Sequence, residues 1–283
     1  SDLVFVGYGV VAPEYSWNDY AGLDVEGKTV VMLVNDPGYA REDELFKGKA
    51  MTYYGRWTYK IEEAGRQGAT GAIVVHETAP ASYGWDVVAN SWSGALADLV
   101  RSDGGDNRTL YEGWITEETA RALFAEGGLD FSDMKDRAKT EGFTPVDMGN
   151  LKASGRFEQT VTTTESRNVV GQLPGASAPD EYMLFTAHWD HLGKKSEEKA
   201  GEPNQDFYRD DIFNGAVDNA TGTAALLEIA EAMAVEQIDR SALFLAVTLE
   251  ESGLLGSAYY AENPSVPMNQ IVAGLNMDGM LPV

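Results

Sequence analysis

"LFTAHWDHLG", residues 184–193, is an apolar run that ends at a histidine and continues into an aspartate and a second histidine. The chain has only three histidines, so two of them lie in this stretch. Histidine and aspartate are costly to bury without partners. We therefore interpret the stretch as a buried strand whose C-terminal end carries functional groups.

Two more apolar runs follow, "SALFLAVTL" at 241–249 and "IVAGLNM" at 271–277. Together with 181–187 they are nearly continuous in apolar residues, which is typical of strands buried on both faces of a parallel sheet. Helical spacing of apolar residues predicts a helix at 220–235, and a second helix is expected at 254–263. Strands that alternate with helices predict an α/β fold with an open, mostly parallel sheet and flanking helices.

The first half of the chain has a different pattern, in which short β-rich runs alternate with turns. The expected elements are strands at 3–12 and 28–34, a helix and a strand across 53–75, and short helices at 117–126 and 132–140. Thr116 and Ser132 are the expected N-caps of the two short helices. We predict a β-rich α/β domain at 1–150 and a second domain at 151–283.

The composition limits the partners. The chain of 283 residues has 45 acidic and 21 basic side chains, a formal net charge of −24, which disfavours nucleic acid and anionic membranes. It lacks an apolar run of about 18 residues, so we expect no membrane span. There is no cysteine, so any metal must be held by His, Asp and Glu.

Polar groups follow all three predicted strands. The residues concerned are His188 and Asp190, Glu250 and Glu251, Asp278, and also Asp218 in the loop before the predicted helix at 220. Because functional sites in open α/β sheets gather at the carboxyl ends of strands, we expect these side chains to lie together. Carboxylates crowded in this way repel each other unless a cation intervenes. Two ions about 3.5–4 Å apart can share one carboxylate, and Asp218 is the expected bridge.

Neighbouring residues in these motifs can divide the chemistry. Asp190 could accept a hydrogen bond from the ring of His188, because the two side chains share one side of an extended chain. Of Glu250 and Glu251, one could bind metal while the other acts as a general base. We expect His191 to be structural, since an adjacent turn residue would point away. Each motif alone also has a plain structural interpretation, such as a buried His–Asp pair or a helix cap.

The motifs "TAHWDHLG", "FNGAVDNATGTAALLEIAEAM", "LEESGLLGSAYYAENP" and "NMDG", in this order, resemble the M28 family of dizinc aminopeptidases. The first half, from "VFVGYGVVAPEYSWNDYAGLDVEGKTVVML" onward, resembles the protease-associated (PA) domain that is inserted in many members. The resemblance covers nearly the whole chain. It implies a zinc exopeptidase-like fold, incomplete here, preceded by a PA-like domain.

The resemblance also implies roles for the site residues. His188 and Asp278 would bind one zinc, Asp218 would bridge, Glu251 would bind the second zinc, Glu250 would be the general base and Asp190 would orient His188. The implied cofactors are two Zn ions, with Co or Mn as possible substitutes, and the implied substrates are peptides. A cis peptide bond between Asp218 and Asn219 is a further expectation.

One departure from the family pattern concerns the end of the chain. The family has a further histidine ligand downstream of the position of Asp278, whereas this chain ends at Val283. We therefore expect a fragment, truncated before the last metal ligand, which could be inactive by itself. Our hypothesis is an aminopeptidase, periplasmic or secreted, whose oligomeric state the sequence leaves open. The alternatives are a carboxypeptidase of the same superfamily and a non-catalytic receptor or scaffold.

Overall fold

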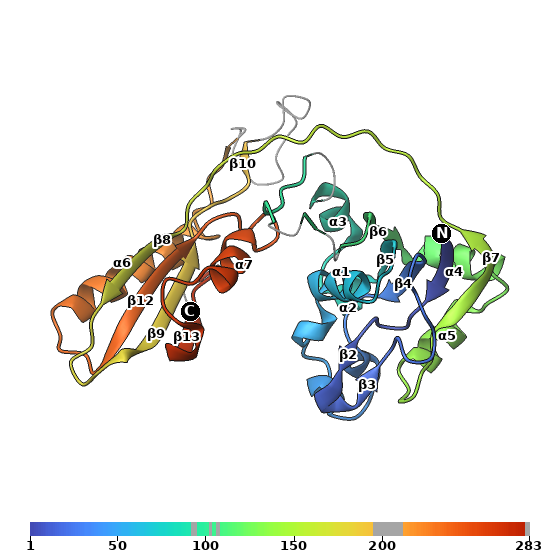
Figure 1. Ribbon diagram of the computed structural model, residues 1–283, viewed down its shortest axis with the longest axis horizontal. Coiled ribbons are helices and arrows are strands. Elements are labelled where there is room, and N and C mark those ends of the chain that lie inside the picture. Colours follow the sequence, from blue (N-terminus) through green and yellow to red (C-terminus); the bar gives the residue numbers. More distant parts are fainter. Residues whose placement is uncertain (92–94, 102–103, 106–107, 195–211, 281–283) are drawn as a thin grey trace. The chain divides into compact units, whose positions relative to one another are not determined.

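The computed structural model describes residues 1–91, 95–101, 104–105, 108–194 and 212–280 (Figure 1). It divides into two compact units. The first unit comprises Ser1–Ala95 and Val100–Gln159, and the second comprises Leu96–Leu99 and Thr160–Val283. The predicted boundary at residue 150 falls inside strand β7 (Val146–Lys152), which pairs with β1 (Asp2–Phe5) of the first unit.

The first unit contains a five-stranded sheet in the order β6-β5-β4-β1-β7. Its other strands are β4 (Thr29–Leu33), β5 (Gly71–His76) and β6 (Tyr111–Thr116). All neighbours are parallel except β7, which runs antiparallel to β1. The predicted strand at 3–12 is shorter than expected, because Gly7 and Gly9 turn the chain at φ of 59° and 64° before the short strands β2 (Val11–Ala12) and β3 (Trp17–Asn18).

Helices cover both faces of this sheet. The helices of the first unit are α1 (Trp57–Arg66), α2 (Thr78–Ala81), α3 (Trp85–Ser91), α4 (Glu117–Glu126) and α5 (Phe131–Ala138), with 3-10 turns at Pro13–Tyr15, Pro37–Ala40, Leu45–Lys47 and Tyr53–Gly55. Phe5 of β1 packs against Phe124 of α4, with ring centroids 5.0 Å apart. On the other face, Val4 belongs to a core cluster with Ile61 of α1. Phe5 and Val4 face opposite sides of the sheet because successive side chains of a strand point to opposite faces.

The N-caps of α4 and α5 test two sequence predictions. Thr116 caps α4 as expected, and its hydroxyl accepts the backbone N–H of Thr119 at 3.1 Å. The prediction of Ser132 as the cap of α5 was wrong. The helix begins at Phe131 because Asp130 accepts the N–H of Asp133 at 2.8 Å.

The second unit has a four-stranded sheet in the order β13-β9-β12-β8. Its strands are β8 (Val169–Leu173), β9 (Ala178–His188), β12 (Arg240–Val247) and β13 (Ile271–Asn276). β9 runs parallel to both β12 and β13, and β8 is antiparallel at the edge. The predicted open, mostly parallel sheet is therefore confirmed. A short pair of strands, β10 (Gly193–Lys194) and β11 (Ile212–Phe213), is antiparallel.

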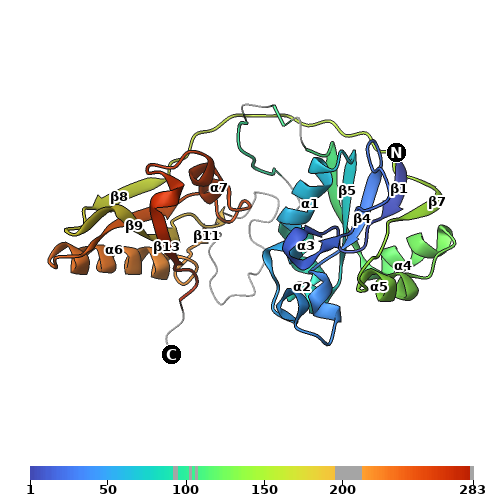
Figure 2. The same cartoon turned by 60° about the horizontal axis from the view of Figure 1, so that its bottom comes forward.

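The helices of this unit are α6 (Ala220–Ala234) and α7 (Leu255–Glu262), with a 3-10 turn at Met268–Gln270. They cover opposite faces of the sheet (Figure 2). On one face Leu226 of α6 clusters with Ala242 and Phe244, and on the other Tyr260 of α7 clusters with Leu243 and Leu245. Both predicted helices are confirmed. Within the described ranges, no helix combines the length and hydrophobicity that a membrane span needs.

Candidate metal centre

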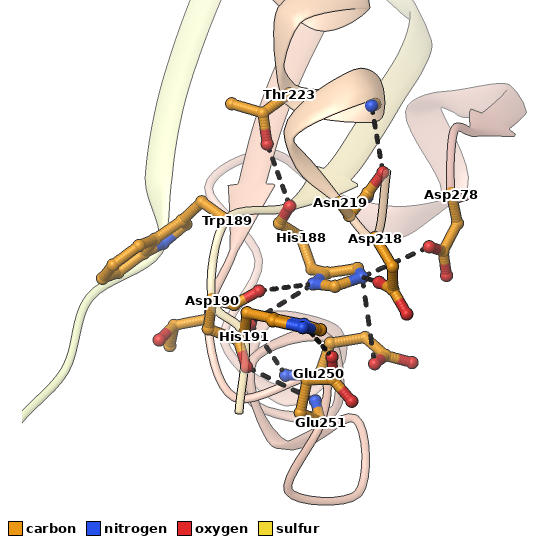
Figure 3. Close-up of polar contacts among 12 residues, drawn as sticks. His188, Trp189, Asp190, His191, Asp218, Asn219, Thr223, Glu250, Glu251 and Asp278 are labelled. Carbon is orange, nitrogen blue, oxygen red and sulfur yellow. Dashed lines mark hydrogen bonds and ion pairs between the residues drawn. The ribbon is translucent and has the colours of Figure 1, made fainter. Parts of the chain in front are cut away.

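The parallel register of the sheet brings three strand ends to one edge. His188, the last residue of β9, lies beside Val247 of β12, and Thr186 of β9 lies beside Asn276 of β13. The segments that follow β12 and β13 therefore start at the same edge, and they carry Glu250 and Asp278. Figure 3 shows these side chains converging on the ring of His188, as expected from the sequence.

One group of ligand atoms surrounds the buried His188. Its Nε2 atom lies 3.0 Å from Oδ1 of Asp218 and 3.2 Å from Oδ1 of Asp278. Ligand atoms of one tetrahedral zinc, each about 2.0–2.1 Å from the ion, are about 3.3 Å apart. Both distances from Nε2 therefore suit a single divalent ion, and the three ligand atoms all lie within 4.8 Å of one another.

A second group comprises His191, Asp218 and Glu251, whose potential ligand atoms all lie within 4.8 Å of one another. Asp218 belongs to both groups, which is the position expected of a bridging carboxylate. Nδ1 of His191 is 2.5 Å from Oε1 of Glu251. The prediction that His191 points away was wrong.

The local backbone explains the direction of His191. Trp189 turns to the opposite side, where its indole N–H donates to the carbonyl of Arg167 at 3.1 Å (Figure 3). The pairing of β10 with β11 brings Gly215 against His191, and a Cβ on Gly215 would lie 2.9 Å from Cγ of His191. A glycine, here at φ 61°, is thus needed for the ring to occupy this place.

Asp190 has a different role from the one we expected. The ring of His188 donates from Nδ1 to the backbone carbonyl of Asp190 at 3.0 Å, and the nearest carboxylate oxygen is 3.6 Å away. The carboxylate of Asp190 instead accepts the backbone N–H groups of Glu250 and Glu251, at 3.1 and 3.3 Å. Asp190 therefore fixes the turn that carries both glutamates.

The same hydrogen bond determines the tautomer of His188. A carbonyl oxygen can only accept, so Nδ1 carries the proton and Nε2 presents its lone pair to Asp218 and Asp278 when the ring is neutral. A lone pair facing two carboxylate oxygens is repulsive. Either a second proton or a cation must lie between them.

Glu250 belongs to neither ligand group, and its Oε2 atom is 4.0 Å from Nε2 of His188. Burial raises the pKa of Glu250, and the carboxylates of Asp278 and Glu251 raise it further, although His188 lowers it. Burial and Asp218 also raise the pKa of Glu251. The pKa of His188 is raised overall, because nearby carboxylates outweigh its burial. The carboxylates at this edge of the sheet therefore repel one another, and their negative charge is not balanced by the nearby histidines.

The charge balance supports a cation here. Across the described part of the chain, the ion-pair partners of Asp218, Glu250, Glu251 and Asp278 are histidines alone, with no Lys or Arg among them. Imidazole and carboxylate are the ligands of catalytic zinc sites, and they also suit Co and Mn. The residues therefore fit the expected metals.

Asn219 holds the two sides of the site together. Its Oδ1 atom accepts the N–H groups of Gly222 at 3.0 Å and Gly279 at 3.3 Å, and its Nδ2 donates to the carbonyl of Met277 at 2.9 Å. The first bond caps α6, and the other two fix the residues on either side of Asp278. The Asp218–Asn219 peptide bond is cis, as the resemblance implied. We did not predict this role of the Asn219 side chain.

Comparisons with known proteins show what the second unit is similar to. Residues 168–282 match the model of peptidase family M28. The chain is 29% identical to a "Probable zinc metalloprotease" of Pyrenophora teres f. teres, over 50% of this chain and 28% of that protein. A "Glutamate carboxypeptidase 2 homolog" of Caenorhabditis elegans is 23% identical over 98% of this chain and 37% of its own length. "Aminopeptidase NAALADL1" of Mus musculus is 32% identical over 40% of this chain and 13% of its own length.

The chain thus spans less than two-fifths of the length of these curated relatives. Among solved structures, an aminopeptidase from Aneurinibacillus sp. strain AM-1 matches with a TM-score of 0.40 and 20% identity, over 99% of this chain and 50% of that one. A peptidase M28 precursor from Shewanella amazonensis matches with a TM-score of 0.35 and 18% identity, over 98% and 51%. Residues 168–282, which are 115 of the 283 residues, thus match the model of peptidase family M28.

Proposed function

We propose that the chain is part of a metal-dependent exopeptidase, an aminopeptidase that removes N-terminal residues from peptides with two zinc ions. The observation that carries the proposal is the pair of ligand groups that share Asp218, with Glu250 beside both of them. One ion would be held by His188, Asp278 and Asp218, and the other by Glu251 and Asp218. Zinc bound there would lower the pKa of a water molecule and polarise the scissile carbonyl.

Glu250 is suited to move the proton in this reaction. It would take a proton from the attacking water and later give it to the amine that leaves when the peptide bond breaks. A general base works best when its pKa is closer to neutral than that of an ordinary carboxyl group, and burial raises the pKa of Glu250. The carboxylate of Asp190 accepts the backbone N–H of Glu250, and this hydrogen bond positions the Glu250 side chain.

The charges favour an aminopeptidase over the alternative of a carboxypeptidase. An aminopeptidase must bind the ammonium group of its substrate, which the acidic side chains at this edge would attract. A carboxypeptidase needs a basic group for the substrate carboxylate, and no Lys or Arg pairs with the site carboxylates within the described residues. A carboxypeptidase remains the second candidate, since two proteins named "Glutamate carboxypeptidase 2 homolog", from Caenorhabditis briggsae and Caenorhabditis elegans, match 86% and 98% of this chain.

We also propose that the first unit is a PA-like accessory domain of the same enzyme. The alignments with the two Caenorhabditis proteins support this combination, because coverage of 86% and 98% of the chain includes both units.

The replacement Glu250→Gln in the full-length protein tests the proposed function. The amide cannot take a proton, so we expect kcat on amino-acid anilides to fall by about 10²–10⁴-fold. The zinc content should stay unchanged, because Glu250 belongs to neither ligand group. The matched control is Glu228→Gln on the exposed side of α6, which should keep normal activity. Near-normal turnover of Glu250→Gln with zinc bound would exclude Glu250 as the base.

The substrates that the wild-type protein cleaves distinguish an aminopeptidase from a carboxypeptidase. An aminopeptidase cleaves anilides with a free amino group and leaves N-acetylated dipeptides intact. Cleavage of the N-acetylated dipeptides alone would support the carboxypeptidase.

A further inference from the structure

We propose that Asn168 is a positioning residue of the peptidase site, which holds the loop 248–256 and with it the carboxylate of Glu250. This inference rests on the proposed function, in which Glu250 is the base. It concerns a residue that lies outside both ligand groups and directly before β8.

The register of the sheet places Asn168 beside this loop. β8 runs antiparallel to β12, with Val169 opposite Ala246, so Asn168 lies next to the end of β12. The loop that follows β12 carries Glu250 and leads into α7. Asn168 is therefore close to the point where the loop leaves the sheet.

The Asn168 side chain binds both ends of the loop, which meet at Thr248 and Gly256. Its Oδ1 atom accepts the backbone N–H of Thr248 at 3.1 Å, and its Nδ2 donates to the carbonyl of Gly256 at 2.7 Å. The remaining backbone groups bind each other, since the N–H of Gly256 donates to the carbonyl of Thr248 at 3.0 Å. A Cβ on Gly256 would lie 2.1 Å from that carbonyl oxygen and 2.7 Å from Oδ1 of Asn168, so the junction is closely packed.

The backbone of the loop needs such support. Leu249, directly before Glu250, has a φ of 53°, and Leu254 has a φ of 62°. Residues other than glycine are disfavoured in this left-handed region and stay there only when surrounding contacts hold them. Asn168 supplies these contacts at the ends of the loop, and Asp190 supplies them in its middle through the N–H of Glu250.

The support at Asn168 bears on the proton transfer. When the ends of the loop are released, Leu249 can relax to an ordinary conformation, and the carboxylate of Glu250 moves relative to the water that it deprotonates. A displacement of about 1 Å caused by a change far from the chemistry can lower a rate by about 100-fold. The effect belongs to the chemical step, so we expect it in kcat rather than in KM.

The replacement Asn168→Ala in the full-length protein tests the inference. The matched control is Ser241→Ala, at the other end of β12. The buried hydroxyl of Ser241 accepts the backbone N–H of Gly175 at 2.9 Å and donates to the carbonyl of Pro179 at 2.8 Å. Each variant therefore loses one accepted and one donated hydrogen bond to the backbone. Circular dichroism checks that both variants fold.

Kinetics and hydrogen exchange report on the loop independently. Turnover of amino-acid anilides with excess zinc gives kcat and KM, and hydrogen exchange measured by mass spectrometry gives the opening of segment 248–256 without reference to activity. A milder variant is Ser166→Ala, which removes only the 2.6 Å contact between the hydroxyls of Ser166 and Thr248. It should change both quantities in the same direction as Asn168→Ala, by a smaller factor.

We expect the kcat of Asn168→Ala to fall by about 10–100-fold with KM nearly unchanged, and segment 248–256 to exchange faster than in wild type. Ser241→Ala should keep the kcat and the exchange of this segment. When Asn168→Ala is added to Glu250→Gln, kcat should fall little further, because both changes impair the same proton transfer.

Three results would overturn the role of Asn168 and leave the proposed function standing. They are an unchanged kcat in Asn168→Ala, exchange of segment 248–256 no faster than in Ser241→Ala, and losses that add fully in the double variant with Glu250→Gln. A wild-type protein that binds zinc but cleaves neither anilides nor N-acetylated dipeptides would overturn the proposed function, and the inference with it.

Discussion

At the scale of single residues, the site depends on which backbone groups its side chains bind. Asp190 shows this most directly. Its carboxylate accepts two N–H groups from the segment after β12, and its carbonyl accepts the ring N–H of His188. One residue thus fixes the tautomer of a ligand and the position of the proposed base, without belonging to either ligand group.

The residue scale also explains what the sequence could not predict. The residues that follow each strand could be placed at one edge, because strand direction follows from the fold class. The directions of His191 and of the Asp190 carboxylate depend on turn dihedrals and on the close approach of Gly215, which comes from a different segment. The local sequence around His191 does not reveal its contact with Gly215.

A buried lysine in the first unit gives a prediction at the same scale. The Lys60 side chain of α1 is fully buried, and its ammonium donates to the carbonyl of Tyr8. Burial lowers the pKa of Lys60 from 10.5 to about 7, although the carboxylates of Asp19 and Asp36 raise it. Between these two values the unfolded chain binds more protons than the folded chain, so stability gained through this residue rises with pH.

We therefore expect the wild-type chain to gain stability relative to Lys60→Met by about 1 kcal/mol per pH unit above about pH 7. Urea unfolding of both proteins at several pH values measures the difference. The exposed Lys47→Met serves as control and should show no such trend. A difference between wild type and Lys60→Met that is independent of pH would show that Lys60 keeps its ordinary pKa in the fold.

At the scale of elements, hydrogen bonds of one side chain join the start of α6 to the segment that follows β13. Asn219 caps the helix, and the same side chain binds Met277 and Gly279 on both sides of Asp278. A Cβ on Gly222 would lie only 2.3 Å from the carbonyl oxygen of Met277, so the helix approaches this segment as closely as its backbone allows. The elements that carry Asp218 and Asp278 are therefore joined directly.

Replacing Asn219 with alanine should destabilise this junction. The change removes a helix cap, which contributes about 1 kcal/mol, and leaves a buried carbonyl unpaired, which costs about 1–3 kcal/mol. We expect the free energy of unfolding to fall by about 2–4 kcal/mol and zinc to bind more weakly. Urea unfolding and zinc titration measure the two effects.

Asp130→Ala provides the matched control, since Asp130 caps α5 through one exposed hydrogen bond. It should cost about 1 kcal/mol and leave zinc binding unchanged. An Asn219→Ala protein that is no less stable than Asp130→Ala, with normal zinc affinity, would contradict the role of Asn219.

The presence of the helices and strands was the feature that the sequence predicted best. Apolar runs gave β9, β12 and β13, and helical spacing gave α6, because strands and helices leave different periods in the sequence. The prediction that all three strands are buried was wrong for β13, which lies at the edge of the sheet and is mostly exposed. Boundaries were less predictable. The strand expected at 3–12 is interrupted by positive φ at Gly7 and Gly9, and Asp130 rather than Ser132 starts α5. Glycine and capping residues are compatible with several conformations, and packing selects one.

At the scale of the whole molecule, the chain has a net charge of −24 and places the carboxylates of Asp218, Glu250, Glu251 and Asp278 at one sheet edge of its second unit. Such a site is stable when cations neutralise it. The first unit has its own hydrophobic cores on both faces of its sheet. Metal binding should therefore raise the melting temperature of the second unit, which thermal unfolding with and without zinc would measure.

The central claim is that two metal ions share Asp218, and zinc stoichiometry of three variants tests it most directly. The claim predicts two zinc ions per chain for wild type and for the exposed Asp180→Asn control, one for Asp278→Asn, and fewer than one for Asp218→Asn, because only Asp218 belongs to both ligand groups. If Asp218→Asn keeps as much zinc as Asp278→Asn, Asp218 is not shared and the account of the site is wrong.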